Sequence, residues 1–250
     1  MPAPLVDFGS RKMKMPNIRK LFLPDPNTTF FDIDLDSADL RIVVWESDCK
    51  EMKEWFRNGI KPYVAIAQEY HHDQTITKAH PQYKVFKSLC HGTNYLGKAN
   101  GIAPRVGLDV REVERIQKWY FDKFPEIRKW QDDLINKLHA NRYVQNVFGY
   151  RMHFLDRLEG NVVNQAVAAI PQSTVACLIN RGYANIHKNL QEVEVLLQVH
   201  DSLAGQFPTH LGDWAKRRIV EECSVPLPYA EPLVIPVDIV TSKQSWGGCH

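Results

Sequence analysis

The order of periodic patterns along the chain constrains the fold more than any other feature of the sequence. Residues 48–142 carry mainly helical periodicity, and strand-like patterns lie on both sides of this block. Strands and helices do not alternate one by one, as they would in a parallel sheet built from βαβ units. The sequence therefore predicts an α+β fold in which a helical block is inserted into a discontinuous, strand-containing core.

The individual patterns predict the elements of this fold. A strand is expected at 30–35, a loop at 101–110, hairpins at 143–154 and 193–207, and a last strand at 233–240. Helical patterns cover the remaining segments, which are 37–57, a short helix from Pro62, 81–96, 110–123, 125–140, 161–189 and 210–222.

Length, charge and cysteine usage exclude several classes of protein. The chain has 250 residues, enough for one large or two small domains. Its net charge of +2 gives almost no global attraction to nucleic acid, so any basic site must be local. The five cysteines form no C-x-x-C pair, which argues against a disulfide framework and favours a reducing, cytoplasmic location. The sequence contains no run of 18 apolar residues, so no membrane span is predicted.

Residues 9–20, GSRKMKMPNIRK, form a local basic segment. Five of its twelve residues are basic and none is acidic. The segment is either a solvated arm or a contact for nucleic-acid phosphates, because clustered Lys and Arg side chains supply the electrostatic part of such binding.

Two acidic residues from distant segments are candidates for a metal site. In FFDIDL, Phe31 and Ile33 alternate with Asp32 and Asp34, which predicts a strand with one apolar and one carboxylate face. Asp201 lies at the tip of the hairpin VLLQVHDSL. If the two strand ends meet, Asp34 and Asp201 offer the carboxylate oxygens that Mg²⁺ prefers. Each is also an ordinary turn residue when taken alone, and the sequence does not fix their meeting.

A stripe of polar side chains marks one face of the helix expected at 81–96. Lys87, His91 and Tyr95 are spaced by four residues, which places them on one helix face. A cation followed by two flat polar rings suits a triphosphate at one end and a base or sugar at the other. The alternative is a partly exposed face on which Lys87 extends its ammonium group into solvent.

These segments match motifs of family A DNA polymerases, the bacterial polymerase I type, and phage members most closely. DLDSADLR at 34–41 resembles the first palm motif of that family, KSLCHGTNYLG at 87–97 resembles its fingers helix, and LQVHDS at 197–202 resembles its third motif. IPQST at 170–174 and FGYR at 148–151 are similar to further motifs, in the family's order and spacing.

The resemblance implies a domain organisation. A palm with an antiparallel sheet is expected over 1–47 and 156–250, with helical fingers over 48–155. Family members carry a thumb, and often a 3′–5′ exonuclease, before the first palm motif, whereas only 33 residues precede Asp34 here. Both domains are therefore expected to be absent, which indicates either a fragment or a split polymerase completed by a second polypeptide.

The resemblance also assigns roles to individual residues. Asp34 and Asp201 would be catalytic and would hold two Mg²⁺ ions, with Mn²⁺ as a substitute, aided by the backbone carbonyl of Leu35. The incoming dNTP would be bound by Lys87, His91, Tyr95, Asp39 and Lys84. Primer–template DNA would be contacted by Gln172, His200, Arg151, Arg41, Arg11 and Lys12.

Four positions depart from the family pattern. Tyr83 replaces an Arg that normally contacts phosphate, so that contact is either missing or moved to Lys84. Ser202 replaces the common Glu after the third-motif Asp, and Ala168 replaces an Asn. Asp39 replaces the Glu beside the ribose, so looser discrimination between sugars is expected.

The function expected from the resemblance is template-directed DNA synthesis, by transfer of a nucleotide from dNTP to a primer 3′-OH. One alternative is a polymerase remnant that binds DNA or a replication partner without catalysis, and another is a metal-dependent nuclease. An RNA-synthesising variant is also open, because sugar choice depends on few residues. The expected location is the cytoplasm, which would be the host's for a phage protein.

Overall fold

The computed structural model describes residues 5–8, 11–14 and 16–249. The chain forms two compact units, which we call the sheet unit (residues 1–38, 175–227 and 231–250) and the helical unit (39–174 and 228–230). Both boundaries between the units lie inside the expected palm segments. The first follows residue 38 rather than residue 47, and the second follows residue 174 rather than residue 155. The helix over 38–47 and the first half of the helix over 161–189 thus belong to the helical unit. The assignment of palm and fingers stays a prediction.

The sheet unit is built on an antiparallel four-stranded sheet in the order β6-β7-β3-β8. Its strands are β3 (Thr28–Leu35), β6 (Glu194–Val199), β7 (Ser202–Pro208) and β8 (Val237–Ser242). The predicted α+β class, the 30–35 strand and the hairpin over 193–207 are confirmed. The last strand begins later than expected, because Pro236 has no N–H to donate to the ladder.

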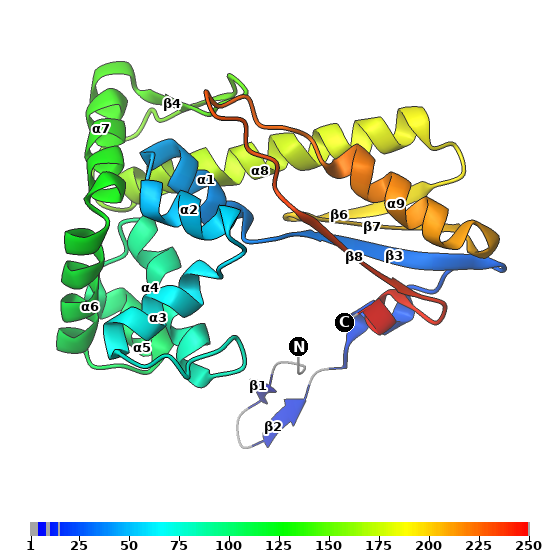
Figure 1. The fold of residues 1–250 in the computed structure, drawn as a ribbon, viewed down its shortest axis with the longest axis horizontal. Helices are drawn as coiled ribbons and strands as arrows, with labels where there is room; N and C mark the ends of the chain where they lie inside the picture. Colours follow the sequence, from blue (N-terminus) through cyan, green and yellow to red (C-terminus); the bar gives the residue numbers. More distant parts are fainter. Residues whose placement is uncertain (1–4, 9–10, 15, 250) are drawn as a thin grey trace. The chain divides into compact units, whose positions relative to one another are not determined.

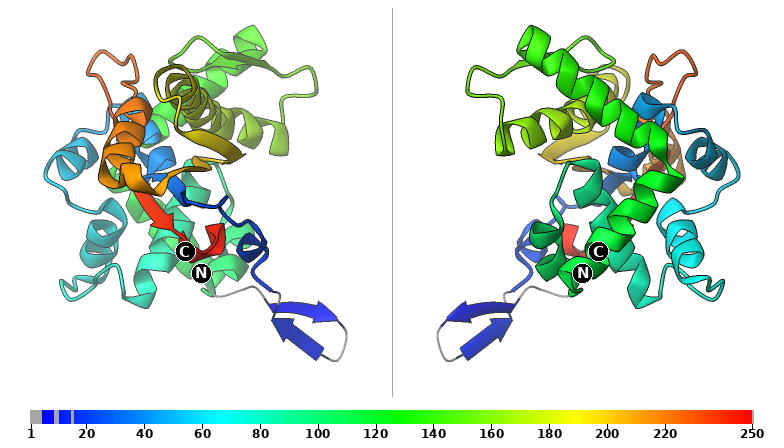
Figure 2. Two further views of the ribbon diagram at one scale, coloured as in Figure 1. Left: turned by 90° about the vertical axis from the view of Figure 1, so that its right-hand side faces the viewer. Right: turned by 90° about the vertical axis from the view of Figure 1, so that its left-hand side faces the viewer.

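Helices cover one face of this sheet (Figure 1). They are the C-terminal half of α8 (Asn161–Asn189) and α9 (Gly212–Cys223). The 3-10 helices η1 (Ile18–Leu21) and η3 (Trp246–Cys249) lie on the other face, and η2 (Thr209–Leu211) precedes α9. Figure 2 shows the same elements from the two sides. A separate hairpin pairs β1 (Leu5–Phe8) with β2 (Arg11–Lys14).

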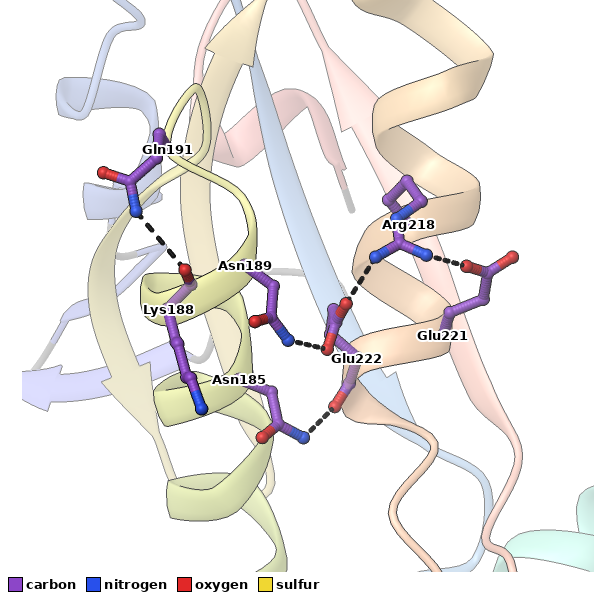
Figure 3. Close-up of polar contacts among 7 residues, drawn as sticks. All are labelled: Asn185, Lys188, Asn189, Gln191, Arg218, Glu221 and Glu222. Atoms are coloured by element: carbon purple, nitrogen blue, oxygen red, sulfur yellow. Dashed lines mark hydrogen bonds and ion pairs between the residues drawn. The ribbon is translucent and has the colours of Figure 1, made fainter.

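Polar contacts join α8 to α9 (Figure 3). The side-chain amide of Asn189 donates to the Glu222 carboxylate at 2.8 Å, and that of Asn185 donates to the Glu222 carbonyl at 3.0 Å. Arg218 donates to Glu222 from the same helix at 2.6 Å. Gly182 lets the helices approach, because a Cβ at this position would lie 3.1 Å from Cys223 Sγ. These contacts fix the two helices to each other above the sheet.

The helical unit contains a succession of short helices, and two sequence expectations fail within it. The helix expected over 37–57 is two helices, because Asp48 takes a left-handed φ of 54° between them. The loop expected at 101–110 is wrong, since a helix begins at Ala99 and passes through Pro104; burial of Ile102 and Ala103 outweighs the lost hydrogen bond. The helices are α1 (Ala38–Ser47), α2 (Lys50–Arg57), α3 (Pro62–His71), α4 (Pro81–Asn94), α5 (Ala99–Val106), α6 (Val110–Lys123) and α7 (Pro125–Asn141).

A short hairpin and the first half of α8 complete the helical unit. The hairpin pairs β4 (Tyr143–Gln145) with β5 (Arg151–His153), as expected from the pattern over 143–154. Within the described residues, α8 alone is long and apolar enough to cross a membrane by composition. Half of its most apolar window is buried in the protein, which is typical of a core helix.

Candidate active site

The sheet brings the two predicted catalytic carboxylates to one end of neighbouring strands. Asp34 is the exposed residue near the end of β3, and its cross-strand partner on β7 is Ser202. Asp201 directly precedes Ser202 in the chain. Side chains of residues paired in this way lie roughly 5 Å apart, so Asp34 faces Ser202 and lies next to the turn that carries Asp201. Leu35, the third predicted metal ligand, is buried at the last position of β3.

A two-residue turn carries Asp201. Val199 on β6 pairs with Ser202 on β7, and only His200 and Asp201 connect them. His200 is exposed and takes a left-handed φ of 56°, which is uncommon for a residue other than glycine. The tight turn therefore holds Asp201 at the tip of the hairpin, beside the end of β3.

A third carboxylate faces the same strand end. Asp238 on β8 is the cross-strand partner of Asp34 on its other side, and both side chains are exposed. Asp238 is not among the residues predicted from the sequence, because pairing of the last strand with β3 cannot be read from periodicity. Within the part of the chain that the structure describes, no group of three His, Cys, Asp or Glu side chains is close enough to hold a metal ion.

The carboxylate face expected for β3 is not open along its length. Asp32 is only 5% exposed, because η3 covers this part of the sheet. Phe30 and Trp246 belong to a small apolar core there, together with Ala204 and Cys249. Of the two acids on β3, Asp34 is therefore exposed and Asp32 is buried.

The predicted nucleotide-binding residues lie in the helical unit, along α4 and the start of α1. Lys84 and Lys87 are exposed on α4. His91 lies near the end of that helix and Tyr95 caps it, with their ring centroids 4.6 Å apart at an interplanar angle of 70°. The stripe predicted from the four-residue spacing is thus present as a cation followed by two contacting rings.

Asp39 lies beside these two rings. One of its carboxylate oxygens is 3.7 Å from Nδ1 of His91. Burial, together with the Asp39 charge, raises the pKa of the Tyr95 phenol well above its ordinary value. The structure therefore brings Asp39, His91 and Tyr95 together, although they are far apart in the sequence.

The predicted DNA-contacting residues differ in how far they are exposed to solvent. Gln172 on α8, Arg151 on β5 and His200 are exposed. Arg41, in contrast, is 8% exposed, with its guanidinium 4.1 Å from the Phe56 ring centre. This burial argues against a direct contact between Arg41 and DNA. Arg11 and Lys12 lie on β2, and their side chains are outside the described part of the chain.

Asn146 fixes the hairpin that carries Arg151 to the helix that carries Gln172. Its side-chain oxygen accepts hydrogen bonds from the backbone N–H groups of Phe148 and Tyr150, both at 3.0 Å. Its amide nitrogen donates to Ser173 Oγ on α8, also at 3.0 Å. Asn146 itself is 3% exposed, and all three bonds are partly buried.

We expect Asn146→Ala to lower the free energy of unfolding by about 2–6 kcal/mol, because it leaves two backbone donors without their acceptor at a cost of about 1–3 kcal/mol each. Chemical denaturation monitored by circular dichroism measures this change. Ser173→Ala removes one bond of the same network and should cost only about 1 kcal/mol. Equal losses in the two variants would contradict the role of Asn146.

A hollow of about 410 Å³ in the helical unit is lined in part by a half-buried acid. Its lining includes Glu46, Trp130, Lys137 and Tyr143. Burial raises the pKa of Glu46, while a hydrogen bond from the Tyr229 hydroxyl at 2.8 Å and the Lys137 charge partly offset this effect. Glu46 is therefore easier to protonate in the folded chain than in the unfolded one.

The raised pKa predicts a pH-dependent effect of Glu46→Gln. A carboxyl that binds its proton more tightly in the folded state stabilises the fold below its ordinary pKa of 4.5 and loses this contribution as pH rises through the raised value. The midpoint of thermal unfolding of Glu46→Gln minus that of the parent should therefore increase between pH 4 and pH 8. The exposed Glu114→Gln serves as the control, and an unchanged or falling difference would contradict the prediction.

Known proteins match this chain over most of its length. The family model for DNA polymerase family A matches residues 4–246. A DNA polymerase of Mycobacterium phage D29 is 24% identical over 233 residues, which cover 93% of this chain and 37% of that protein. DNA polymerase I of Chloroflexus aurantiacus is 28% identical over 200 residues, or 76% of this chain and 21% of that protein.

A solved structure has the same fold. The POL domain of Pol1 from M. smegmatis, in complex with DNA primer-template and dNTP, superposes with a TM-score of 0.82 at 20% identity, over 93% of this chain and 42% of that one. The chain thus spans well under half the length of these relatives. The family match extends over nearly all of the sequence, and this chain belongs to DNA polymerase family A.

Proposed function

We propose that this chain carries out template-directed DNA synthesis, in which a nucleotide is transferred from dNTP to a primer 3′-OH. The observation that carries the proposal is the position of Asp34 at the end of β3, next to the β6–β7 turn that carries Asp201, in a chain whose family is DNA polymerase family A. The substrates would be primer–template DNA and deoxynucleotides.

The donor atoms at the strand end fit Mg²⁺. Asp34 is exposed and Asp201 is half-buried, so both can offer carboxylate oxygens to an ion that also retains water and binds substrate phosphates. With the Leu35 carbonyl they would hold two ions. When bound, the ions would activate the primer 3′-OH and neutralise charge on the triphosphate and on departing pyrophosphate.

The helical unit would bind and orient the nucleotide. The exposed ammonium group of Lys87, aided by Lys84, would neutralise the triphosphate, as phosphate-binding lysines do. His91 would face the incoming nucleotide, and Tyr95 would lie near the templating base. Asp39 contacts His91 and would limit the space beside the ribose.

The short side chain at position 39 leads to a further prediction. Asp39→Glu adds one methylene and should narrow the space beside the ribose, so we expect a roughly tenfold larger preference for dNTP over NTP, since a methylene contributes about 1–3 kcal/mol to such discrimination. Single-nucleotide incorporation with the two substrates measures the ratio. An unchanged ratio of dNTP to NTP incorporation would contradict the role of Asp39. Asp109→Glu, at the N-cap of α6, provides the control.

DNA contacts would come from Gln172, Arg151 and His200, which are exposed. The basic segment with Arg11 and Lys12 would add phosphate contacts that weaken as salt rises. A second polypeptide that supplies a thumb or exonuclease, and a location in the host cytoplasm, both stay predictions. Mass measurement of the protein purified from its source would detect such a partner.

Primer extension tests the proposal against its alternatives. A primer labelled at its 5′ end is annealed to a template and incubated with the chain, Mg²⁺ and deoxynucleotides. Nucleotide-dependent lengthening supports synthesis, whereas shortening in the absence of nucleotides would support a nuclease. Retarded migration of the DNA in a native gel without any change in primer length would support the binding-only remnant.

A further inference from the structure

Asp32 is a buried acid next to the proposed metal site, and the proposed mechanism does not use it. Its side chain accepts a hydrogen bond from Ser202 Oγ at 2.6 Å and another from Trp246 Nε1 at 2.5 Å. Burying a carboxylate costs several kcal/mol unless hydrogen bonds compensate for the lost water. These two short bonds engage both of its oxygens.

The bond to Ser202 runs diagonally across the strand ladder. The direct partner of Asp32 on β7 is Ala204, whereas Ser202 lies two residues nearer the strand end on the same face. Diagonal neighbours in an antiparallel pair are within reach of polar side chains. The bond therefore braces the end of the β3–β7 pair at which Asp34 and Asp201 lie.

This end of the sheet needs such a brace. The turn before Ser202 has only two residues and places His200 at a left-handed φ of 56°, which disfavours the turn by roughly 1 kcal/mol or more. Strand β6, on the other side of β7, has a register shift between Val195 and Leu197. The regular pairing of β7 with β3 is thus the firmer support for Asp201.

Trp246 holds the Asp32 carboxylate in place from the opposite side. Its backbone N–H donates to the Phe22 carbonyl at 2.9 Å, and the two rings meet edge to face at 5.5 Å. The guanidinium of Arg19 lies 4.6 Å from the centre of the indole ring. The indole therefore cannot turn away from Asp32 without losing its contacts with the Phe22 ring and the Arg19 guanidinium.

We propose that Asp32 is a positioning residue, which holds the Ser202 hydroxyl and thereby fixes the Asp201 carboxylate for a divalent cation shared with Asp34. The inference rests on the proposed function, since it assigns Asp201 to a metal site. Metal binding can be measured without catalysis, so the two proposals can fail separately.

The test measures Mn²⁺ binding to the full chain by electron paramagnetic resonance of the free ion. Ser202→Ala removes the hydroxyl and should weaken Mn²⁺ affinity about tenfold, the effect typical of losing a partner that orients a metal ligand. Ser202→Thr keeps the hydroxyl and should remain within about threefold of the parent, since the same hydrogen bond can form.

A matched control lies at the other end of the same strand pair. Thr29 on β3 and Thr209 share a hydrogen bond between their hydroxyls at 2.9 Å. Thr29→Val also removes one hydroxyl bond but is remote from Asp34, so Mn²⁺ affinity should not change. Thermal unfolding of each variant shows whether the fold is kept.

Three results would overturn the proposal. These are equal Mn²⁺ affinities for Ser202→Ala and Thr29→Val, a folded Ser202→Thr variant as weak as Ser202→Ala, and a parent chain that binds no Mn²⁺. The double variant Asp32→Ala/Ser202→Ala should bind Mn²⁺ no more weakly than Asp32→Ala alone, because both substitutions remove the same hydrogen bond. If Asp32→Ala does not fold, the comparison of Mn²⁺ affinity between Ser202→Ala and Ser202→Thr tests the proposal. Normal Mn²⁺ binding without primer extension would overturn the proposed function alone.

Discussion

Asp201→Asn should abolish DNA synthesis while leaving the fold intact. The carboxylate lies at the tip of a tight turn next to the end of β3, so its loss removes one of the two predicted metal-binding carboxylates. A metal ion contributes several kcal/mol to stabilising a phosphoryl-transfer transition state. We therefore expect the rate of single-nucleotide incorporation to fall by roughly 10³-fold or more.

The matched control for this prediction is Asp213→Asn. Asp213 is also exposed in the sheet unit, where it forms an ion pair with Lys216 at 3.0 Å. Its replacement should leave the incorporation rate within about twofold, since an isolated surface pair contributes little. A folded Asp201→Asn variant that keeps more than a tenth of the parent rate would contradict the catalytic assignment.

Lys87→Ala should raise the KM for dNTP by roughly 10–100-fold, because a hydrogen bond to a charged group contributes about 1.5–3 kcal/mol. Lys87 is exposed on α4, one helical turn before His91, and its ammonium group is accessible to a triphosphate. Steady-state incorporation with varied dNTP concentration measures KM and kcat separately. Lys84→Ala should have a smaller effect, since Lys84 is the auxiliary cation.

Lys118→Ala on α6 is the control for charge alone. Lys118 is exposed and pairs with Asp122 at 2.6 Å, so its loss should not change nucleotide binding. If Lys87→Ala and Lys118→Ala had the same KM, the assignment of Lys87 to the triphosphate would be wrong.

The sequence was sufficient to predict the strands and long helices that hold the candidate sites. Alternation in FFDIDL and the pattern of VLLQVHDSL identified β3 and the β6–β7 hairpin. Spacing by four residues identified the stripe on α4. These patterns are local, so periodicity alone reveals them.

Features that depend on distant contacts could not be predicted. The burial of Asp32 results from η3, whose Trp246 is 214 residues away in the sequence. Arg41 was expected at DNA because of its motif, yet it packs against Phe56 on the next helix. Asp238 faces Asp34 only because β8 pairs with β3. Sequence patterns do not encode which strands become neighbours.

Local rules also failed at two positions. Asp48 interrupts the helical pattern of 37–57 with a left-handed residue, although the apolar periodicity continues across it. Pro104 normally argues against a helix, but apolar burial on α5 outweighs the lost hydrogen bond. At Pro104 tertiary packing decided the backbone conformation.

The most direct test of the central claim is single-nucleotide incorporation opposite each of the four template bases, with Mg²⁺, for the parent chain and for Asp34→Asn. We predict that the parent extends the primer by the complementary nucleotide only and that Asp34→Asn extends it with none. Equal incorporation of complementary and non-complementary nucleotides would contradict the account. So would a folded Asp34→Asn variant that is as active as the parent.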